Sequence, residues 1–266
     1  MMFPNGTCIV NADDFGMSTT INRAIVECFH RGLISSATLM ANMPGFEDAC
    51  QQIHAGRLLK RVGIHLNLTD GQPLRNDTRN CSELCDAAGN FRRFRSTWLS
   101  RSARQIIAGE INAQIQRCRD AGVPLTHADS HQHVHNEPLV LPPVLAALRR
   151  HNVRYLRITR NIDRHSLMSA KAVAKSLYNS VISASGRRGT RWFGSVENFA
   201  ALRATGCVPL GSFEILTHPS LNDQGVLIDH LDGLPLTERL RTTFQGLRLV
   251  SYSGQPVEIT AALRAA

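Results

Sequence analysis

The sequence alternates short apolar, β-branched runs with longer segments of helical periodicity along most of its length. We expect strands at residues 7–10, 34–40, 62–68, 125–130, 153–159, 212–216 and 248–252. Between them, apolar residues recur at helical spacing at 21–29, 45–59, 103–119, 138–150, 166–183, 196–204 and 236–247. Because parallel strands need a long crossover, usually a helix, this order predicts a mostly parallel sheet with right-handed connections.

Polar side chains stand at the C-terminal ends of five of these expected strands. They are Asp13 and Asp14, Asn42, His65, Asp129 with His131, and His218. A (β/α) barrel brings all such ends to one mouth, whereas an open sheet would leave some of them far apart. No glycine-rich phosphate loop follows the first strand, which disfavours a dinucleotide-binding fold. We therefore expect an α/β fold, an irregular, TIM-like (β/α) barrel.

The length of 266 residues suits one such barrel domain over residues 1–266. Residues 70–100 are polar and turn-rich, so we expect an insertion at about 70–100. A variable loop at about 184–195 is expected to carry Trp192 and Phe193.

Composition narrows the possible partners and the compartment. The formal net charge of +9 comes mostly from arginines scattered along the chain, which favours a solvated surface over a nucleic-acid footprint. An anionic group on a substrate stays open as a target for these arginines. The sequence contains no run of about 18 apolar residues, so we expect no membrane span. Its first residues lack the features of a secretory signal. Seven scattered cysteines are typical of reduced thiols in a cytoplasmic protein.

The most chemically informative stretch is Thr126–His135, which contains four histidines and one aspartate. Imidazole and carboxylate groups bind divalent metals and move protons near neutral pH. On an extended backbone, His131, His133 and His135 would lie on one side with Asp129. A surface histidine cluster without a metal is the alternative interpretation.

Two other segments carry matching chemistry. Asp13 and Asp14 are adjacent, so both can address one cavity only if the chain turns at Phe15–Gly16. Taken alone, the Asp13–Asp14 pair could instead be an acidic pair that stabilises the N-terminus of the following helix. His65 taken alone could be a buried core histidine whose hydrogen bonds are made within the protein. One aspartate and two histidines from separate strands would form a facial metal site with positions open for water and substrate. The combination therefore predicts metal-assisted hydrolysis.

Three segments, Asn11–Gly16, Gly63–Thr69 and Asp129–His135, together resemble the YdjC-like carbohydrate deacetylases. These are also called the ChbG/HpnK family, which includes chitooligosaccharide deacetylases. Shorter similarities lie at 71–74, 89–91 and 217–219. The resemblance implies an irregular (β/α) barrel, often a homodimer, and one divalent metal ion, Mg²⁺ or Zn²⁺. It implies that the metal is held by Asp14, His65 and His131, with Asp13 as general base and His218 as general acid.

The activity that this resemblance implies is removal of an N-acetyl group from an amino sugar or oligosaccharide. Further residues are candidates for binding that substrate: Asn42, Asn67, Asp129, His133, Trp192 and Phe193. An aromatic platform under the sugar ring and ordinary packing both remain open for Trp192 and Phe193. The alternative functions are a metal-dependent phosphoesterase, a glycoside hydrolase using Asp13 and Asp14, and a non-catalytic sugar-binding module.

Overall fold

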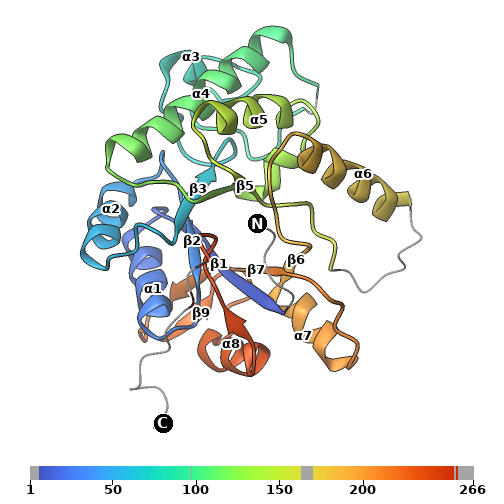
Figure 1. The fold of residues 1–266 in the computed structure, drawn as a ribbon. Helices are drawn as coiled ribbons and strands as arrows, with labels where there is room; N and C mark the ends of the chain where they lie inside the picture. The colour runs from blue at the N-terminus through green and yellow to red at the C-terminus, as the bar shows by residue number, and fades with distance from the viewer. Residues whose placement is uncertain (1–5, 97, 163–169, 255, 257–266) are drawn as a thin grey trace.

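In the computed structural model, the chain folds into a curled, mostly parallel sheet with helices along its outer side (Figure 1). The structure describes residues 6–96, 98–162, 170–254 and 256. The strand order is β5-β4-β3-β2-β1-β7-β6, and β10 pairs with the start of β1. The strands are β1 Thr7–Phe15, β2 Ser36–Leu39, β3 Val62–Leu66, β4 His127–Ser130, β5 Tyr155–Leu156, β6 Trp192–Ser195, β7 Phe213–Thr217 and β10 Arg248–Leu249.

The helices follow the strands in the expected order. They are α1 Thr19–His30, α2 Phe46–Ala55, α3 Asn76–Arg79, α4 Arg101–Asp120, the 3₁₀ segment η1 His131–Asn136, α5 Leu141–Arg150, α6 Ala170–Ala184, α7 Val196–Ala204 and α8 Leu236–Phe244. Local sequence explains several starts. The Ser18 hydroxyl accepts a hydrogen bond from the Ile21 amide at the start of α1, and Ser195 with Asn198 forms a capping box on α7.

The sheet curls into a half-barrel, and no ladder joins β5 to β6 among the described residues. Isolated backbone bonds cross this gap instead. The Leu156 amide donates to the Arg188 carbonyl at 2.9 Å, and the amides of Asn161 and Ile162 donate to the Phe193 carbonyl at 3.1 and 3.0 Å. The fold is thus an α/β half-barrel with helices, and the mouth at the strand C-terminal ends is retained.

Each strand divides its residues between two environments, because side chains alternate across a sheet. On β1, the even-numbered Cys8, Val10 and Ala12 pack in the main core with the helices. Ile9, two residues before Asn11, belongs to a separate small cluster on the other face of the sheet. Asn11 and Asp13 bear the same parity as Ile9 and are fully or almost fully buried, so the inner face is polar.

Some elements differ from expectation. Trp192 and Phe193 lie in strand β6 rather than in a loop, since they pair with β7. The β8 (Pro219–Leu221) and β9 (Leu227–Asp229) hairpin after β7 was not foreseen. Of the helix expected at 166–183, residues 166–169 lie outside the described part. No helix in the described residues is both long and apolar enough to cross a bilayer.

Candidate active site

Arg157, just after β5, occupies the centre of a buried charge network and is itself fully buried. Its Nη1 and Nη2 donate to the two carboxylate oxygens of Asp13, each at 2.7 Å. Its Nε donates to Glu214 Oε1 at 2.6 Å, and Nη1 forms an ion pair with Asp129 Oδ2 at 2.7 Å. Burial alone would raise the pKa of Asp13, but the Arg157 guanidinium outweighs it and holds this pKa well below its usual range. Asp13 is therefore a carboxylate at neutral pH.

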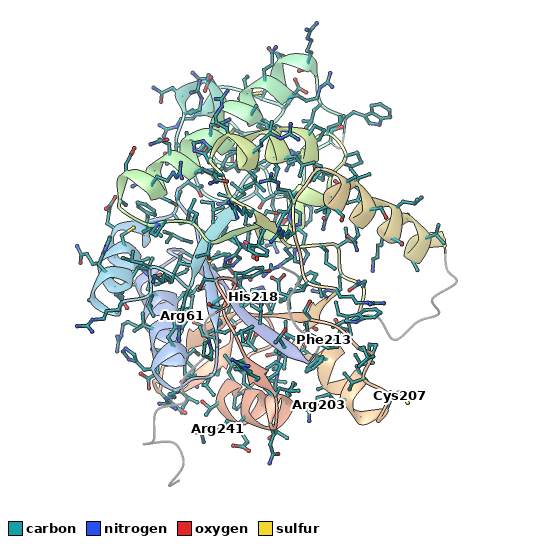
Figure 2. All side chains as sticks on the ribbon, viewed as in Figure 1. Arg61, Arg203, Cys207, Phe213, His218 and Arg241 are labelled. Atoms are coloured by element: carbon teal, nitrogen blue, oxygen red, sulfur yellow. The ribbon has the colours of Figure 1, made fainter. Side chains whose placement is uncertain are left out.

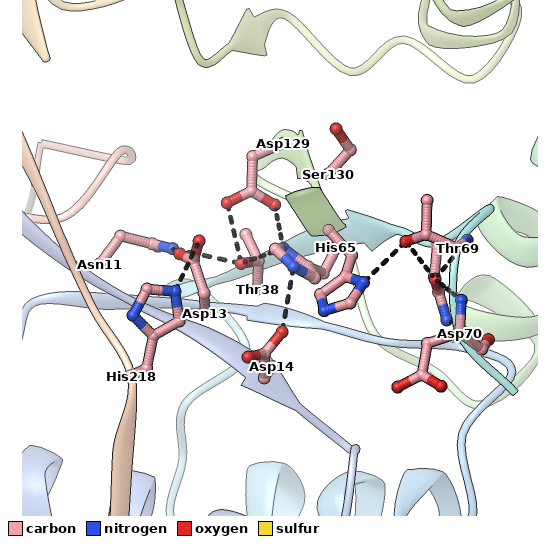
Figure 3. A network of polar contacts seen from close by, with 12 residues as sticks. Asn11, Asp13, Asp14, Thr38, His65, Thr69, Asp70, Asp129, Ser130 and His218 are labelled. Carbon is pink, nitrogen blue, oxygen red and sulfur yellow. Dashed lines mark hydrogen bonds and ion pairs between the residues drawn. The ribbon is translucent and has the colours of Figure 1, made fainter. Parts of the chain in front are cut away.

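His65, on β3, lies between two carboxylates (Figure 3). Its Nδ1 donates to Asp129 Oδ1 at 2.6 Å, and its Nε2 lies 3.2 Å from Asp14 Oδ1. Burial opposes a charge on this ring, but Asp129 and Asp14 overcome it and raise the pKa of His65 to about 10. The hydrogen bond to Asp129 fixes the orientation of the ring and aims Nε2 at Asp14.

Asp14 reaches the same side-chain cluster around His65 as Asp13 because the chain bulges at this point. Asp14 has a φ of 67°, in the left-handed region, and the pairing of β1 with β2 shifts register between Ala12 and Phe15. The turn expected at Phe15–Gly16 thus already begins at Asp14. Its Oδ1 is buried and forms an ion pair with His65 Nε2 at 3.2 Å.

His131, the first residue of η1 after β4, faces His65 with ring centroids 5.9 Å apart. Its Nδ1 shares a 2.8 Å hydrogen bond with the Thr69 hydroxyl, which leaves Nε2 as the free ring nitrogen. Thr69 is placed by Asn67, whose Oδ1 accepts from the Thr69 amide at 3.0 Å. His65 therefore lies between Asp14, whose Oδ1 is 3.2 Å from its Nε2, and the ring of His131.

The expectation that three alternating histidines share one side with Asp129 is wrong. Residues 131–136 form η1, in which Gln132 and His133 have left-handed φ values of 51° and 56°. This backbone turns His135 back to Ser130, whose hydroxyl lies 2.5 Å from His135 Nδ1. His133 packs edge-on against Phe193, with centroids 5.7 Å apart.

His218 directly follows β7. In the view of Figure 2 it lies near the strands, whereas Arg241 lies at the edge of the molecule. Its Nε2 is 3.9 Å from Asp13 Oδ2. The Asp229 carboxylate accepts from the His218 amide at 2.9 Å and fixes the backbone there. His230, from the unforeseen hairpin, adds a second imidazole, with Nε2 3.7 Å from Asp14 Oδ2 and its ring 5.3 Å from that of His218.

The side chains expected to bind substrate are mostly engaged within the protein. The Asn42 amide donates to the carbonyls of Asp70 and Gln72, and Asn67 donates to Asn42 Oδ1, so this pair shapes the loop after β3. Asp129 is committed to His65 and Arg157, as described above.

The two aromatic candidates are also engaged. The Trp192 indole donates to the Leu210 carbonyl at 3.1 Å. Phe193 is fully buried, with the Arg157 guanidinium 4.8 Å from its ring centre. Phe193 therefore belongs to the packing that supports Arg157.

One buried group in the described part of the chain has the spacing of a site for a divalent cation. Asp13, His65 and Asp129 form a buried group whose ligand atoms lie within 4.8 Å of one another. This group has the donor types of a metal site, but both its carboxylates already bind Arg157, whose charge repels a cation. Asp14 lies beside the same imidazole, with Oδ1 buried and 3.2 Å from His65 Nε2, and makes no contact with Arg157 in the described network.

Sequence reasoning missed several members of this site. They are Arg157, Glu214, Thr38, Thr69, Asp229 and His230. The available signal was a charged or polar residue at an inward position of an expected strand, as at Arg157 within 153–159.

Comparisons with known proteins identify the family of this chain. The model of the YdjC-like protein family matches residues 7–245. A carbohydrate deacetylase from Brevibacillus brevis is 36% identical over 229 residues, covering 82% of this chain and 83% of the relative. One from Clostridium beijerinckii is 30% identical over 241 residues, covering 88% and 89%. The chain therefore belongs to the YdjC-like family.

Solved structures share the fold. A protein from Enterococcus faecalis, named a cellobiose-phosphate cleavage protein, superposes with a TM-score of 0.68 at 23% identity, covering 93% of this chain and 98% of that one. A lactam utilization protein from Thermus thermophilus gives a TM-score of 0.53 at 15% identity, covering 92% and 99%. At such identities the likeness concerns the fold alone.

Proposed function

We propose that this chain is a metal-dependent carbohydrate deacetylase, a hydrolase that cleaves the N-acetyl amide of an amino sugar or oligosaccharide. Membership of the YdjC-like family and relatives named carbohydrate deacetylase support this reaction class. The observation that carries the proposal is an ionised Asp13, gripped by Arg157, beside the Asp14–His65 pair.

Asp14, His65 and His131 are the residues that would hold the metal. Asp14 Oδ1 and His65 Nε2 face each other at 3.2 Å, so His65 would give up its Nε2 proton on binding a cation, and His131 Nε2 is the free nitrogen of its ring. The other ring nitrogens are fixed by Asp129 and Thr69, which is the arrangement that orients imidazole ligands. A divalent cation such as Mg²⁺ or Zn²⁺, when bound, polarises a carbonyl oxygen and lowers the pKa of water.

Asp13 serves as the general base in this proposal. Arg157 keeps it ionised. Oδ1 accepts from both Arg157 and Asn11, whereas Oδ2 accepts from Arg157 and retains a lone pair for the proton of an attacking water. The bidentate contact also fixes the plane of the carboxylate, so that the proton acceptor is held in one orientation.

His218 is the proposed general acid. Its Nε2 lies 3.9 Å from Asp13 Oδ2, so the proposed acid and the proposed base are neighbours. A protonated His218 can donate to the sugar nitrogen as the C–N bond breaks. In this hydrolysis, water supplies the hydroxyl of the released acetic acid and the proton gained by the amine.

A screen of N-acetylated sugars with the purified, metal-supplemented chain tests the proposal. Acetate release from N-acetylglucosamine oligomers, absent in Asp13→Asn, is the expected result. Release of inorganic phosphate from sugar phosphates would instead indicate a phosphoesterase, and new reducing ends a glycoside hydrolase. Binding of these oligomers without any product would indicate a sugar-binding module.

A further inference from the structure

We infer that Tyr252 is a positioning residue that holds Asp13 in place through two separate chains of contacts. The inference rests on the proposed function, in which Asp13 is the base. Tyr252 follows β10 and lies beyond residues 7–245, the region matched by the family model.

The Tyr252 side chain lies on the inner face of the sheet. It is 1% exposed and packs with Ile9 and Val250 in a small cluster separate from the main core. The Val250 amide donates to the Cys8 carbonyl at 3.0 Å, which continues the pairing of β10 with β1 and carries Tyr252 inward.

The first chain of contacts runs through Glu214. The Tyr252 hydroxyl donates to Glu214 Oε2, and Glu214 Oε1 accepts from Arg157 Nε at 2.6 Å. Arg157 then donates to both oxygens of Asp13. A buried carboxylate needs a donor on each oxygen, so the tyrosine hydroxyl fixes the plane of Glu214 and hence that of the guanidinium.

The second chain runs through His127. The Tyr252 ring stacks on the His127 ring, with centroids 3.8 Å apart and planes 14° from parallel. His127 Nε2 bonds Asn11 Oδ1 at 3.0 Å, and Asn11 Nδ2 donates to Asp13 Oδ1 at 2.9 Å. Gly63 leaves room for this imidazole, since a Cβ there would lie 2.6 Å from His127 Nδ1.

The two chains meet at Asp13 from different directions. Arg157 contacts it from β5 and Asn11 from two residues earlier on β1, and both depend on groups that touch Tyr252. Ordinary packing of an aromatic side chain would require neither the hydroxyl bond to Glu214 nor the parallel stacking on His127. The conservative change Tyr252→Phe separates these roles, because it removes the hydroxyl and keeps the ring.

Acetate release by Tyr252→Phe, Glu214→Gln and the double variant provides the kinetic test. If the hydroxyl acts through Glu214, Tyr252→Phe lowers kcat about tenfold with KM little changed. A tenfold loss corresponds to about one buried hydrogen bond. The double variant is then no slower than Glu214→Gln alone. Tyr178→Phe, which loses a 3.1 Å bond to the His135 carbonyl outside both chains, keeps the parent kcat. A parent-like kcat in Tyr252→Phe, or effects that multiply in the double variant, overturns the inference.

A second readout is independent of turnover. The buried Arg157 Nε–H should exchange slowly with solvent in ¹H–¹⁵N spectra, and Tyr252→Phe should accelerate that exchange at least about tenfold, whereas Tyr178→Phe should not. If the parent chain releases no acetate, the proposed function fails and this exchange measurement still decides the positioning. Unchanged exchange in Tyr252→Phe would refute the coupling to Arg157.

Discussion

Arg157 donates one hydrogen bond to each oxygen of Asp13, both at 2.7 Å, from a position fully excluded from solvent. The pair joins the end of β1 to the end of β5 across the interior of the sheet. Such a two-point contact defines both the charge and the plane of the carboxylate. Asp129 and Glu214 contact the same guanidinium, so three carboxyl groups share its single positive charge.

Replacing Arg157 with lysine is predicted to impair catalysis more than folding. Lysine keeps the positive charge but is a point donor that cannot bind both Asp13 oxygens in a fork. We expect kcat for acetate release to fall about 100-fold, as for a small misplacement of a catalytic group, with KM little changed. Arg75→Lys is the matched control, because Arg75 makes an exposed two-point contact with Asp77. Parent-like kcat in Arg157→Lys would show that the two-point grip is dispensable.

Asp13→Asn is predicted to abolish turnover while metal binding is retained. The amide has the shape of the carboxylate but cannot accept the proton of water as a base. Activity should fall by about 10²-fold or more, and metal content by elemental analysis should match the parent. If the variant kept near-parent activity, Asp13 would not be the base.

The order of strands and helices was predictable because each strand is a short apolar run and each helix is amphipathic. Strand lengths were less predictable. β1 extends to Phe15 rather than to residue 10, since Asn11 and Ala12 still pair with both neighbouring strands and Phe15 pairs with β2. The position of the site at the strand ends followed from where polar residues interrupt those runs.

Arg157 was not predicted to belong to the site, because the scattered arginines of this sequence favour a solvated surface. The alternation Tyr155-x-Arg157 repeats Asn11-x-Asp13 and His127-x-Asp129, and together they mark a polar inner face. The left-handed turn of η1 was not predictable from residue type, since neither Gln132 nor His133 favours positive φ as glycine does. Tertiary contacts, such as that between His133 and Phe193, accompany that conformation.

Metal binding is predicted to depend on His131 and not on its neighbour His133. His131→Ala should lose both bound metal and acetate release, since its free Nε2 lies in the cavity beside His65. His133→Ala should keep its metal, because His133 packs against Phe193 outside the proposed ligand set. A chelator should silence the parent, and Mg²⁺ or Zn²⁺ should restore it. Equal metal content in both variants would contradict the ligand assignment.

Acid is predicted to destabilise the fold through histidines that are buried in their neutral form. Burial, with Arg157 nearby, holds the pKa values of His127 and His135 well below their ordinary value. In the unfolded chain these rings gain protons below pH about 6.5, so folding stability falls as pH decreases through that value. Each ring contributes a slope of about 1.4 kcal/mol per pH unit well below pH 6.5.

Urea unfolding of the metal-free protein between pH 6 and 5 measures this slope. His65 has a folded pKa of about 10, so its stabilising contribution is already complete below its unfolded pKa and adds little slope in this window. His135→Asn retains a polar atom near Nδ1 for the bond to Ser130 but cannot be protonated. Between pH 6 and 5 the free energy of unfolding of the variant should therefore fall by about 1 kcal/mol less than that of the parent. Parallel stability curves for the two proteins would mean that His135 is not held neutral in the fold.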